Sequence, residues 1–369
     1  MNSFRGRLIG FGLAAAFFAS CTTDEEPLQK YYVYAANANA ANVSAYSMSA
    51  GSGGLKAVEG SPFAAATEPQ SVAVDPSGQF LYVVNYYSNN VSAYSIDAAT
   101  GVLTAVTGSP FPAGLGPYSI AVEPSGRFAY VANAHSGDVW PYSIDPVTGA
   151  LAAYGALAAP AGTHPSSVAV GPSGEFLYVA NEYSGNISVF SINTGSGELT
   201  DIPGSPFATG GYPRSIAIDP SGKFAYVANN IVRNVSALAI DAVTGALTVV
   251  AGSPFAAGTN PVSVAVDPSG AFVYVANWGS SDVSAYSINS TTGALTAIAG
   301  SPYAAGWGPS AIAVDPSGKF IYLANYWSDD ISIFAINATT GALTEPSSSP
   351  VGGVAGGHPS AIAVIRIAQ

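Results

Sequence analysis

The segment from His164 to Ile192 reads "HPSSVAVGPSGEFLYVANEYSGNISVFSI". It holds three short stretches in which small and apolar residues alternate, and this period of two is typical of β-strands. The turn-forming tripeptide "PSG" separates the first two stretches. A nearly identical sequence, "RSIAIDPSGKFAYVANN", begins at Arg214. The chain is therefore built from an internal repeat, and the repeat decides the fold.

The repeat is 48 residues long, as the step from Pro76 to Pro124 shows. "PSG" begins at six positions with this interval, namely Pro76, Pro124, Pro172, Pro220, Pro268 and Pro316. The asparagine that ends the second stretch recurs seven times, at Asn37, Asn85, Asn133, Asn181, Asn229, Asn277 and Asn325. Each copy has four strand-like stretches, the outermost being short, as at Leu103–Val106. The pattern predicts an all-β fold, a seven-bladed β-propeller with four-stranded blades.

The two ends of the repeat region complement each other. The first copy, from Tyr31, begins at its second strand, and a spare first strand, "SAIAVI", lies at Ser360–Ile365. We expect this C-terminal strand to join the N-terminal blade and so close the ring. Closure of this kind hides two sheet edges that would otherwise be open to pairing with other chains.

The N-terminus is typical of an export signal. Arg5 and Arg7 precede an apolar run, Leu8–Ser20, which is too short to span a bilayer as a helix. The only cysteine, Cys21, follows directly and resembles the lipidated cysteine of bacterial lipoproteins. We expect a signal peptide at 1–20, a lipidated cysteine and tether at 21–30, and the propeller at 31–369. The protein would then be exported and anchored in a membrane, facing the periplasm or in the outer membrane; an ordinary secretory signal is the alternative.

The composition limits the partners. The formal net charge is −12, so no basic stripe is available to neutralise phosphates, and nucleic acid is not an expected partner. A single cysteine permits no internal disulfide. No cofactor motif occurs, and His135 and His164 have no third metal ligand at a recognisable spacing. We expect a monomer without cofactor or metal.

The differences between the copies point to one functional face. Four antiparallel strands place the uniform "DPSG" and "TG" turns on one face of the disc. The second loop of each blade and the connections between blades lie on the other face, and these segments are diverse and rich in aromatic residues. The ligand-binding candidates on this face are Tyr86, Tyr118, His135, Arg233, Trp278, Tyr326 and Trp327. The pattern favours a surface that binds a glycan, a peptide or a partner protein, although surface loops also vary without function.

The "YVAN" strands and segments such as "TGALTAIAGSPY" at Thr292–Tyr303 resemble the seven-bladed lactonase-type propellers. That family includes bacterial 6-phosphogluconolactonase and fungal carboxymuconate-lactonising enzyme, and the resemblance covers Tyr31–Gln369. It implies the fold and, by analogy, hydrolysis of a sugar lactone without a cofactor. Because one fold hosts many activities, the activity has to be argued from the site.

The resemblance also implies site residues. Glu182, in "NEY", matches the family glutamate, but Ser166 stands where an arginine is implied and Tyr118 where a histidine is implied. The nearest arginine is Arg214, at the start of the next inner strand, where it can approach Glu182 across adjacent blades. With His164 beside them, these residues are the candidate catalytic group for acid–base work on a lactone; the alternative is a salt bridge that orders the channel mouth. The sequence favours a cell-envelope binding module, with lactonase activity as the alternative.

Overall fold

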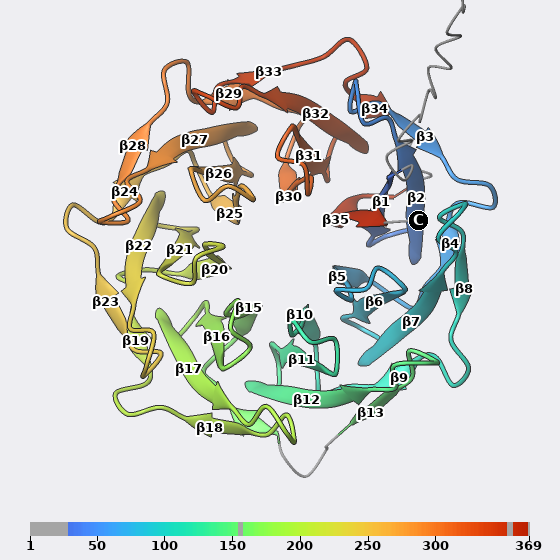
Figure 1. Cartoon of the computed structure of the whole chain (residues 1–369), viewed down its shortest axis with the longest axis horizontal. Coiled ribbons are helices and arrows are strands. Elements are labelled where there is room, and N and C mark those ends of the chain that lie inside the picture. The colour runs from blue at the N-terminus through green and yellow to red at the C-terminus, as the bar shows by residue number, and fades with distance from the viewer. Residues whose placement is uncertain (1–28, 154–157, 353–356, 368–369) are drawn as a thin grey trace, which may run out of the picture.

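The computed structural model describes residues 29–153, 158–352 and 357–367 of the 369-residue chain. The predicted signal peptide, Cys21 and most of the tether lie outside these residues. The described chain forms seven antiparallel sheets arranged as blades around a central axis (Figure 1). No helix occurs in this part of the chain, and so none there is long and apolar enough to cross a membrane. The predicted seven-bladed β-propeller is confirmed.

Each blade follows the same path outward from the axis. Blade 1 combines β35 with β1–β4, and blades 2 to 7 follow in chain order, each with five strands. The inner strands are β5 (Pro69–Val74), β10 (Pro117–Val122), β15 (Pro165–Val170), β20 (Pro213–Ile218), β25 (Pro261–Val266), β30 (Pro309–Val314) and β35 (Pro359–Ile367). The second strands are β1 (Lys30–Asn37), β6 (Phe80–Asn85), β11 (Phe128–Asn133), β16 (Phe176–Asn181), β21 (Phe224–Asn229), β26 (Phe272–Asn277) and β31 (Phe320–Asn325).

The outer half of each blade is equally regular. The third strands are β2 (Asn42–Met48), β7 (Asn90–Ile96), β12 (Asp138–Ile144), β17 (Asn186–Ile192), β22 (Asn234–Ile240), β27 (Asp282–Ile288) and β32 (Asp330–Ile336). The fourth strands are β3 (Leu55–Ala57), β8 (Leu103–Ala105), β13 (Leu151–Ala153), β18 (Leu199–Asp201), β23 (Leu247–Val249), β28 (Leu295–Ala297) and β33 (Leu343–Thr344).

A fifth, two-residue strand in each blade was not predicted. The fourth strand covers only part of the outer edge of the third strand, and the fifth strand pairs with the part that is left free. In blade 2, for example, Phe111 pairs with Val91. Two residues are too few to show an alternating pattern, so these strands could not be predicted from the sequence. These strands are β4 (Phe63–Ala64), β9 (Phe111–Pro112), β14 (Ala159–Pro160), β19 (Phe207–Ala208), β24 (Phe255–Ala256), β29 (Tyr303–Ala304) and β34 (Val351–Gly352).

The ring is closed as expected from the sequence. β35 pairs antiparallel with β1 along its whole length, from Lys30 opposite Ile367 to Asn37 opposite Pro359. In Figure 1 the last strand, in red, lies beside the first, in blue. The N-terminal and C-terminal segments thus share one blade, and no inner strand is missing from the ring.

The core lies between neighbouring blades. The second strands are almost wholly buried because they are covered on both faces by adjacent sheets. Tyr82 illustrates the contact: its ring is fully buried, and its hydroxyl donates to the carbonyl of Gly149 in the next blade at 3.0 Å. The tyrosines at the same position in blades 1, 3, 5, 6 and 7 make the equivalent bond. These bonds link six of the seven blades to the next blade around the ring.

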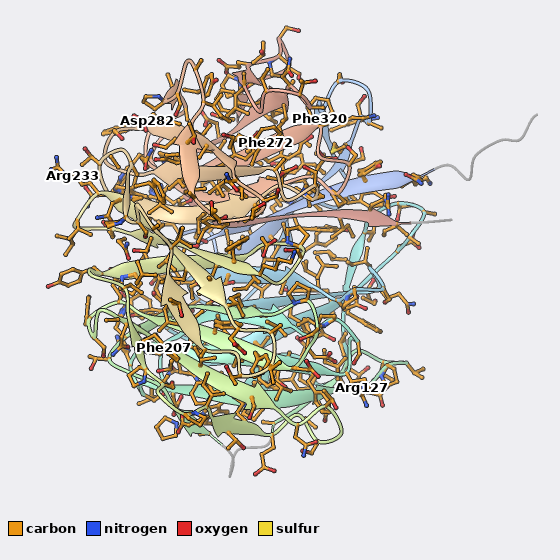
Figure 2. The ribbon with its side chains drawn as sticks, turned by 60° about the vertical axis from the view of Figure 1, so that its left-hand side comes forward. Arg127, Phe207, Arg233, Phe272, Asp282 and Phe320 are labelled. Atoms are coloured by element: carbon orange, nitrogen blue, oxygen red, sulfur yellow. The ribbon has the colours of Figure 1, made fainter. Side chains whose placement is uncertain are left out.

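The two faces of the disc differ in kind. On one face the "DPSG" turns are fixed internally; the Asp75 carboxylate accepts the backbone N–H of Phe80 at 2.6 Å and that of Ser77 at 3.0 Å. The other face, called here the loop face, carries the loops after the second strands and the connections that lead into the inner strands. Arg127, beside the "EPSG" turn that is the counterpart of "DPSG" in blade 3, and Arg233, in a second loop, lie at opposite edges of the side view in Figure 2.

Candidate functional site

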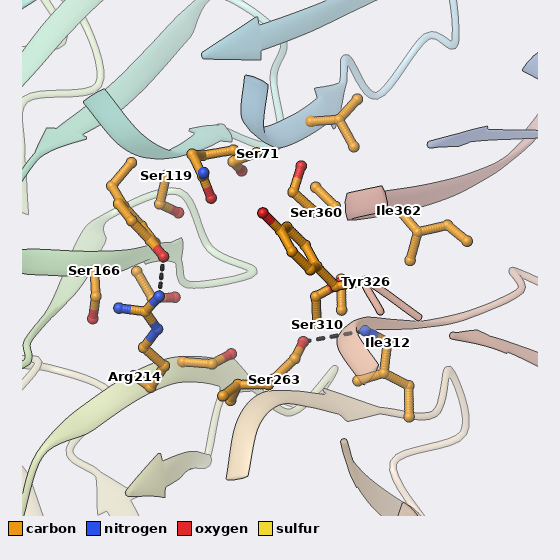
Figure 3. Close-up of a pocket in the computed structure, with 18 of the residues that line it drawn as sticks. Ser71, Ser119, Ser166, Arg214, Ser263, Ser310, Ile312, Tyr326, Ser360 and Ile362 are labelled. Carbon is orange, nitrogen blue, oxygen red and sulfur yellow. Dashed lines mark hydrogen bonds between the residues drawn. The ribbon is translucent and has the colours of Figure 1, made fainter. Parts of the chain in front are cut away.

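The central channel opens on the loop face into a cavity of about 360 Å³. The starts of all seven inner strands line it, because each inner strand begins at the loop face. Figure 3 shows Arg214 on one side of this cavity and Tyr326 on the other, with serines from several blades around the wall. Among the described residues that line the cavity, Arg214 is the only charged one. The cavity is therefore a polar, nearly uncharged pocket with one cation.

The serines of the wall also link the blades. In five blades the second residue of the inner strand after proline is a serine whose Oγ accepts a backbone N–H from the next inner strand; Ser119, for example, accepts from Val168 at 3.2 Å. These serines are Ser71, Ser119, Ser167, Ser215 and Ser263. The accepting oxygen keeps its own O–H available to donate. The repeated serines of the sequence thus form a hydroxyl-lined wall, a role that the repeat pattern alone did not reveal.

Arg214 is held in place by two neighbours. Its Nη1 donates to Glu182 Oε2 at 2.6 Å, and its Nη2 donates to the hydroxyl of Tyr118. The guanidinium also lies over the Tyr118 ring, 4.6 Å from its centroid, a cation–π arrangement. The three residues come from blades 3, 4 and 5, so the contact exists only in the assembled ring. The predicted approach of Glu182 and Arg214 across adjacent blades is confirmed.

Glu182 lies behind Arg214. It follows the end of β16, its side chain is 8% exposed, and it does not line the cavity. His164 Nδ1 is 3.1 Å from the same Oε2, close enough for an ion pair when the imidazole is protonated but misaligned for a hydrogen bond. The His164 ring stacks on Tyr183 with 4.4 Å between centroids. Both contacts use Oε2, which leaves Oε1 without a hydrogen-bond partner among the described residues.

The charges of this group are mutually stabilised. Burial alone raises the pKa of Glu182, but the close contact with His164 and the charge and hydrogen bond of Arg214 outweigh it, so the pKa lies below its usual value. Burial alone lowers the pKa of Arg214, but the electrostatic interactions with Tyr118 and Glu182 are larger, so the pKa lies above its usual value. Burial raises the pKa of the Tyr118 phenol. At neutral pH the site therefore holds a carboxylate, a guanidinium and a neutral phenol.

Most of the predicted ligand-binding residues lie in two aromatic groups at the channel mouth, and one, Arg233, lies outside them. Tyr86 shares a hydrogen bond of 2.7 Å with His135 Nε2, and its ring meets Tyr118 edge-on at 5.8 Å. A second group lies across the channel mouth and contains Trp278, Tyr326 and Trp327. Arg233 is exposed, and among the described residues its side chain makes no hydrogen bond or ion pair. The structure does not bring Arg233 to the cavity.

Some site residues were not selected from the sequence. Tyr183, which stacks on His164, is one; its only signal was its place directly after Glu182. Ser166 is another. It occupies the position at which the family resemblance implies an arginine, and its Oγ donates to the carbonyl of Pro213 at 3.0 Å. The cation at the mouth is thus supplied one blade later, by Arg214. Among the residues that the structure describes, no three His, Cys, Asp or Glu side chains are grouped to hold a metal.

The fold and the site together define a seven-bladed propeller with a cation–carboxylate group at its channel mouth. The model of the family described as "Lactonase, 7-bladed beta-propeller" matches residues 28–115, 110–265 and 204–357. The chain therefore belongs to this family. No curated protein sequence matches it.

Solved structures share the fold at low sequence identity. A provisionally assigned 6-phosphogluconolactonase from Bacteroides fragilis has a TM-score of 0.79 and 21% identity over 93% of this chain and 99% of that one. The periplasmic gluconolactonase PpgL of Pseudomonas aeruginosa has a TM-score of 0.77 and 18% identity over 91% and 99%. Hydrazine synthase from Kuenenia stuttgartiensis has a TM-score of 0.61 and 21% identity over 83% and 95%. At these identities the likeness concerns the fold alone.

Proposed function

We propose that the protein is a lactone hydrolase that opens a sugar lactone at the mouth of the channel. The observation that carries this proposal is the Arg214 guanidinium, which faces the cavity and is fixed between Glu182 and Tyr118. A preorganised donor in a partly buried site stabilises the negative charge that develops on a carbonyl oxygen during acyl transfer. Membership of the lactonase family supports the same reaction class.

Each residue has a role in this reaction. Arg214 and the Tyr118 hydroxyl donate to the lactone carbonyl oxygen; Tyr118 accepts from Arg214, so its own proton stays available. Glu182 lies behind Arg214, so its Oε1 takes a proton from the attacking water by way of one bridging water. It later returns the proton by the same route to the ring oxygen as the C–O bond breaks. His164 orients Glu182 through Oε2. Lactone and water are thus converted to a hydroxy acid with no other reactant.

The charge of the cavity favours a neutral substrate. Arg214 is the only cation in the lining, and Glu182 balances its charge. A phosphorylated lactone would bring two further negative charges without a second cation to pair with them. We therefore expect an unphosphorylated sugar lactone to be hydrolysed faster than its phosphate ester.

The second candidate function is the non-catalytic binding module that the sequence favoured. Its specific support is the group of aromatic rings at the channel mouth. One measurement separates the two functions. Residues 29–369 should hydrolyse D-glucono-1,5-lactone well above its spontaneous rate, and more slowly when the 6-phosphate is used. If neither lactone nor any other aldonolactone is turned over, the hydrolase is rejected in favour of the binding module.

The pH dependence of hydrolysis reports on Glu182. The reaction needs the ionised carboxylate of Glu182, and the pKa of this group lies below the ordinary value of 4.5. The value of kcat/KM should therefore stay constant as the pH falls to about 4.5 and should decline only at lower pH. Arg214→Gln removes one of the groups that lower this pKa. The acid limb of residual activity should then move to higher pH in a pH–rate profile; a limb that stays in place would remove Glu182 from the base role.

Location is a separate proposal. We infer that Cys21 is lipidated and anchors the protein in the cell envelope, because it directly follows an apolar export segment. Cys21→Ser should move the protein from the membrane fraction to the soluble fraction, with Ser20→Ala as the matched control. Unchanged fractionation of Cys21→Ser would contradict the anchor.

A further inference from the structure

Five aromatic side chains form a continuous surface on the loop face, called here the aromatic platform: Trp278, Trp307, Tyr326, Trp327 and His358. Trp327 is the centre of this surface. Its ring lies 5.8 Å from that of Trp278, 6.3 Å from Trp307, 5.0 Å from Tyr326 and 5.5 Å from His358. The group comes from blades 6 and 7 and from the connection into β35, across the mouth from Arg214.

The platform runs from the cavity to the outside of the molecule. Trp278 and Tyr326 line the cavity, whereas Trp307 and Trp327 do not and are 66% and 48% exposed. Figure 3 shows Tyr326 projecting into the cavity on the side opposite Arg214. A ligand whose end reaches Arg214 would therefore extend over Tyr326 and Trp278 onto the two exposed indoles.

Three residues of the platform, Tyr326, Trp327 and His358, are held by contacts within the protein. Tyr326 stacks on His358 with 4.5 Å between centroids and an angle of 11°, and His358 Nδ1 is 2.7 Å from the Tyr326 carbonyl. Gly308 packs against the Trp327 indole, so closely that a Cβ added at this position would overlap the ring. Exposed aromatic rings that are already fixed lose little entropy on binding. Such rings are suited to a specific ligand.

The chemistry of the surface selects a carbohydrate. A sugar ring presents a C–H face, which packs on an aromatic ring, and hydroxyl edges, which suit the serine wall of the cavity. The cavity volume of about 360 Å³ is near the lower end of ligand pockets, about 300–1,000 Å³, so one sugar ring fills it. The charge beside the platform is negative: the carboxylate of Asp329 is 3.9 Å from His358. Phosphates and anionic lipid surfaces are therefore disfavoured.

We propose that the aromatic platform is a glycosyl-binding subsite, and that the ligand is an oligosaccharide whose terminal unit enters the cavity. This inference rests on the proposed hydrolase function, and it identifies the substrate as an oligosaccharide lactone. The lactone ring binds at Arg214, and the next one or two sugar units stack on Trp327 and Trp307.

Binding to the platform is testable without hydrolysis. Unmodified cellotetraose, maltotetraose, laminaritetraose and chitotetraose should be titrated into residues 29–369 while tryptophan fluorescence is followed. At least one should bind, and Trp307→Ala and Trp327→Ala should each raise its Kd about tenfold, as expected for loss of a stacked ring. Tyr212→Ala, an exposed aromatic on the same face with no ring contact to the platform, is the control and should leave Kd unchanged. Absence of binding, equal effects of all three variants, or binding to phosphatidylcholine vesicles instead of any oligosaccharide would overturn the proposal.

Hydrolysis gives the second test. Trp327→Ala should raise KM for cellobiono-1,5-lactone about tenfold and leave KM for D-glucono-1,5-lactone within twofold, because Trp327 does not line the cavity. An equal change for both lactones, or no change for either, contradicts the subsite. The two proposals fail separately: tetrasaccharide binding without lactone turnover removes only the hydrolase, and glucono-lactone turnover without tetrasaccharide binding removes only the platform.

Discussion

Glu182→Gln is expected to lower kcat/KM for a sugar lactone by about 10²–10⁴-fold, the usual contribution of general acid–base catalysis. Glutamine has the same shape and still accepts a hydrogen bond from Arg214, but it cannot take a proton from water. The loss should fall mainly on kcat, because in the proposed reaction the lactone contacts Arg214 and Tyr118, which line the cavity, and not Glu182, which does not. Steady-state kinetics on variants shown to be folded by circular dichroism will measure it.

Glu175→Gln is the matched control, since Glu175 is an exposed carboxylate in the same blade on the opposite face. Its activity should equal that of the wild type. The converse result is also informative. If Glu182→Gln keeps full activity but melts at a lower temperature, the Glu182–Arg214 pair is a structural salt bridge that orders the channel mouth, and another base must be sought.

Removal of residues 359–369 is expected to abolish the stable monomer. The deletion takes away β35, and with it the buried Ile362, Ile365 and Ile367. Burial of three such side chains contributes about 5–9 kcal/mol in all, while a domain is stable by only about 5–15 kcal/mol. The deletion also opens the inner edge of β1 to pairing with other chains. Size-exclusion chromatography and thermal melting should show aggregation or loss of the cooperative transition.

Truncation of residues 368–369 alone is the control, because β35 ends at Ile367. This shorter protein should melt at the wild-type temperature. A protein lacking 359–369 that remained monomeric with an unchanged melting temperature would show that the ring does not depend on the composite blade.

Much of the fold was readable from the sequence because a propeller is a repeat. The 48-residue interval gave the number of blades, and the incomplete first copy predicted the pairing of β35 with β1. Both are properties of hydrophobic pattern and chain order. The two-residue strands, such as Phe111–Pro112, were not predicted, since their pairing depends on the third strand's free edge and not on any local pattern.

The candidate site was likewise predictable only in part from the sequence. Glu182, Arg214 and His164 were selected from the sequence because they differ from their counterparts in a nearly uniform repeat and because Glu182 matches the glutamate of the family that the chain resembles. The sequence did not determine that Arg214 faces the cavity while Glu182 lies behind it, nor that Arg233 stays outside. Side-chain direction at the mouth is set by the neighbouring blade, which is distant in the chain.

The sequence by itself determined the seven blades and their closure, because these follow from periodicity and strand order along the chain. The tertiary structure alone decided which side chains share a site. Tyr118, Glu182 and Arg214 stand in three different blades, up to 96 residues apart, and meet only because the ring brings the ends of those blades to one channel mouth. Contacts of this kind depend on how neighbouring sheets are packed and twisted around the axis, and no local pattern in the sequence encodes them.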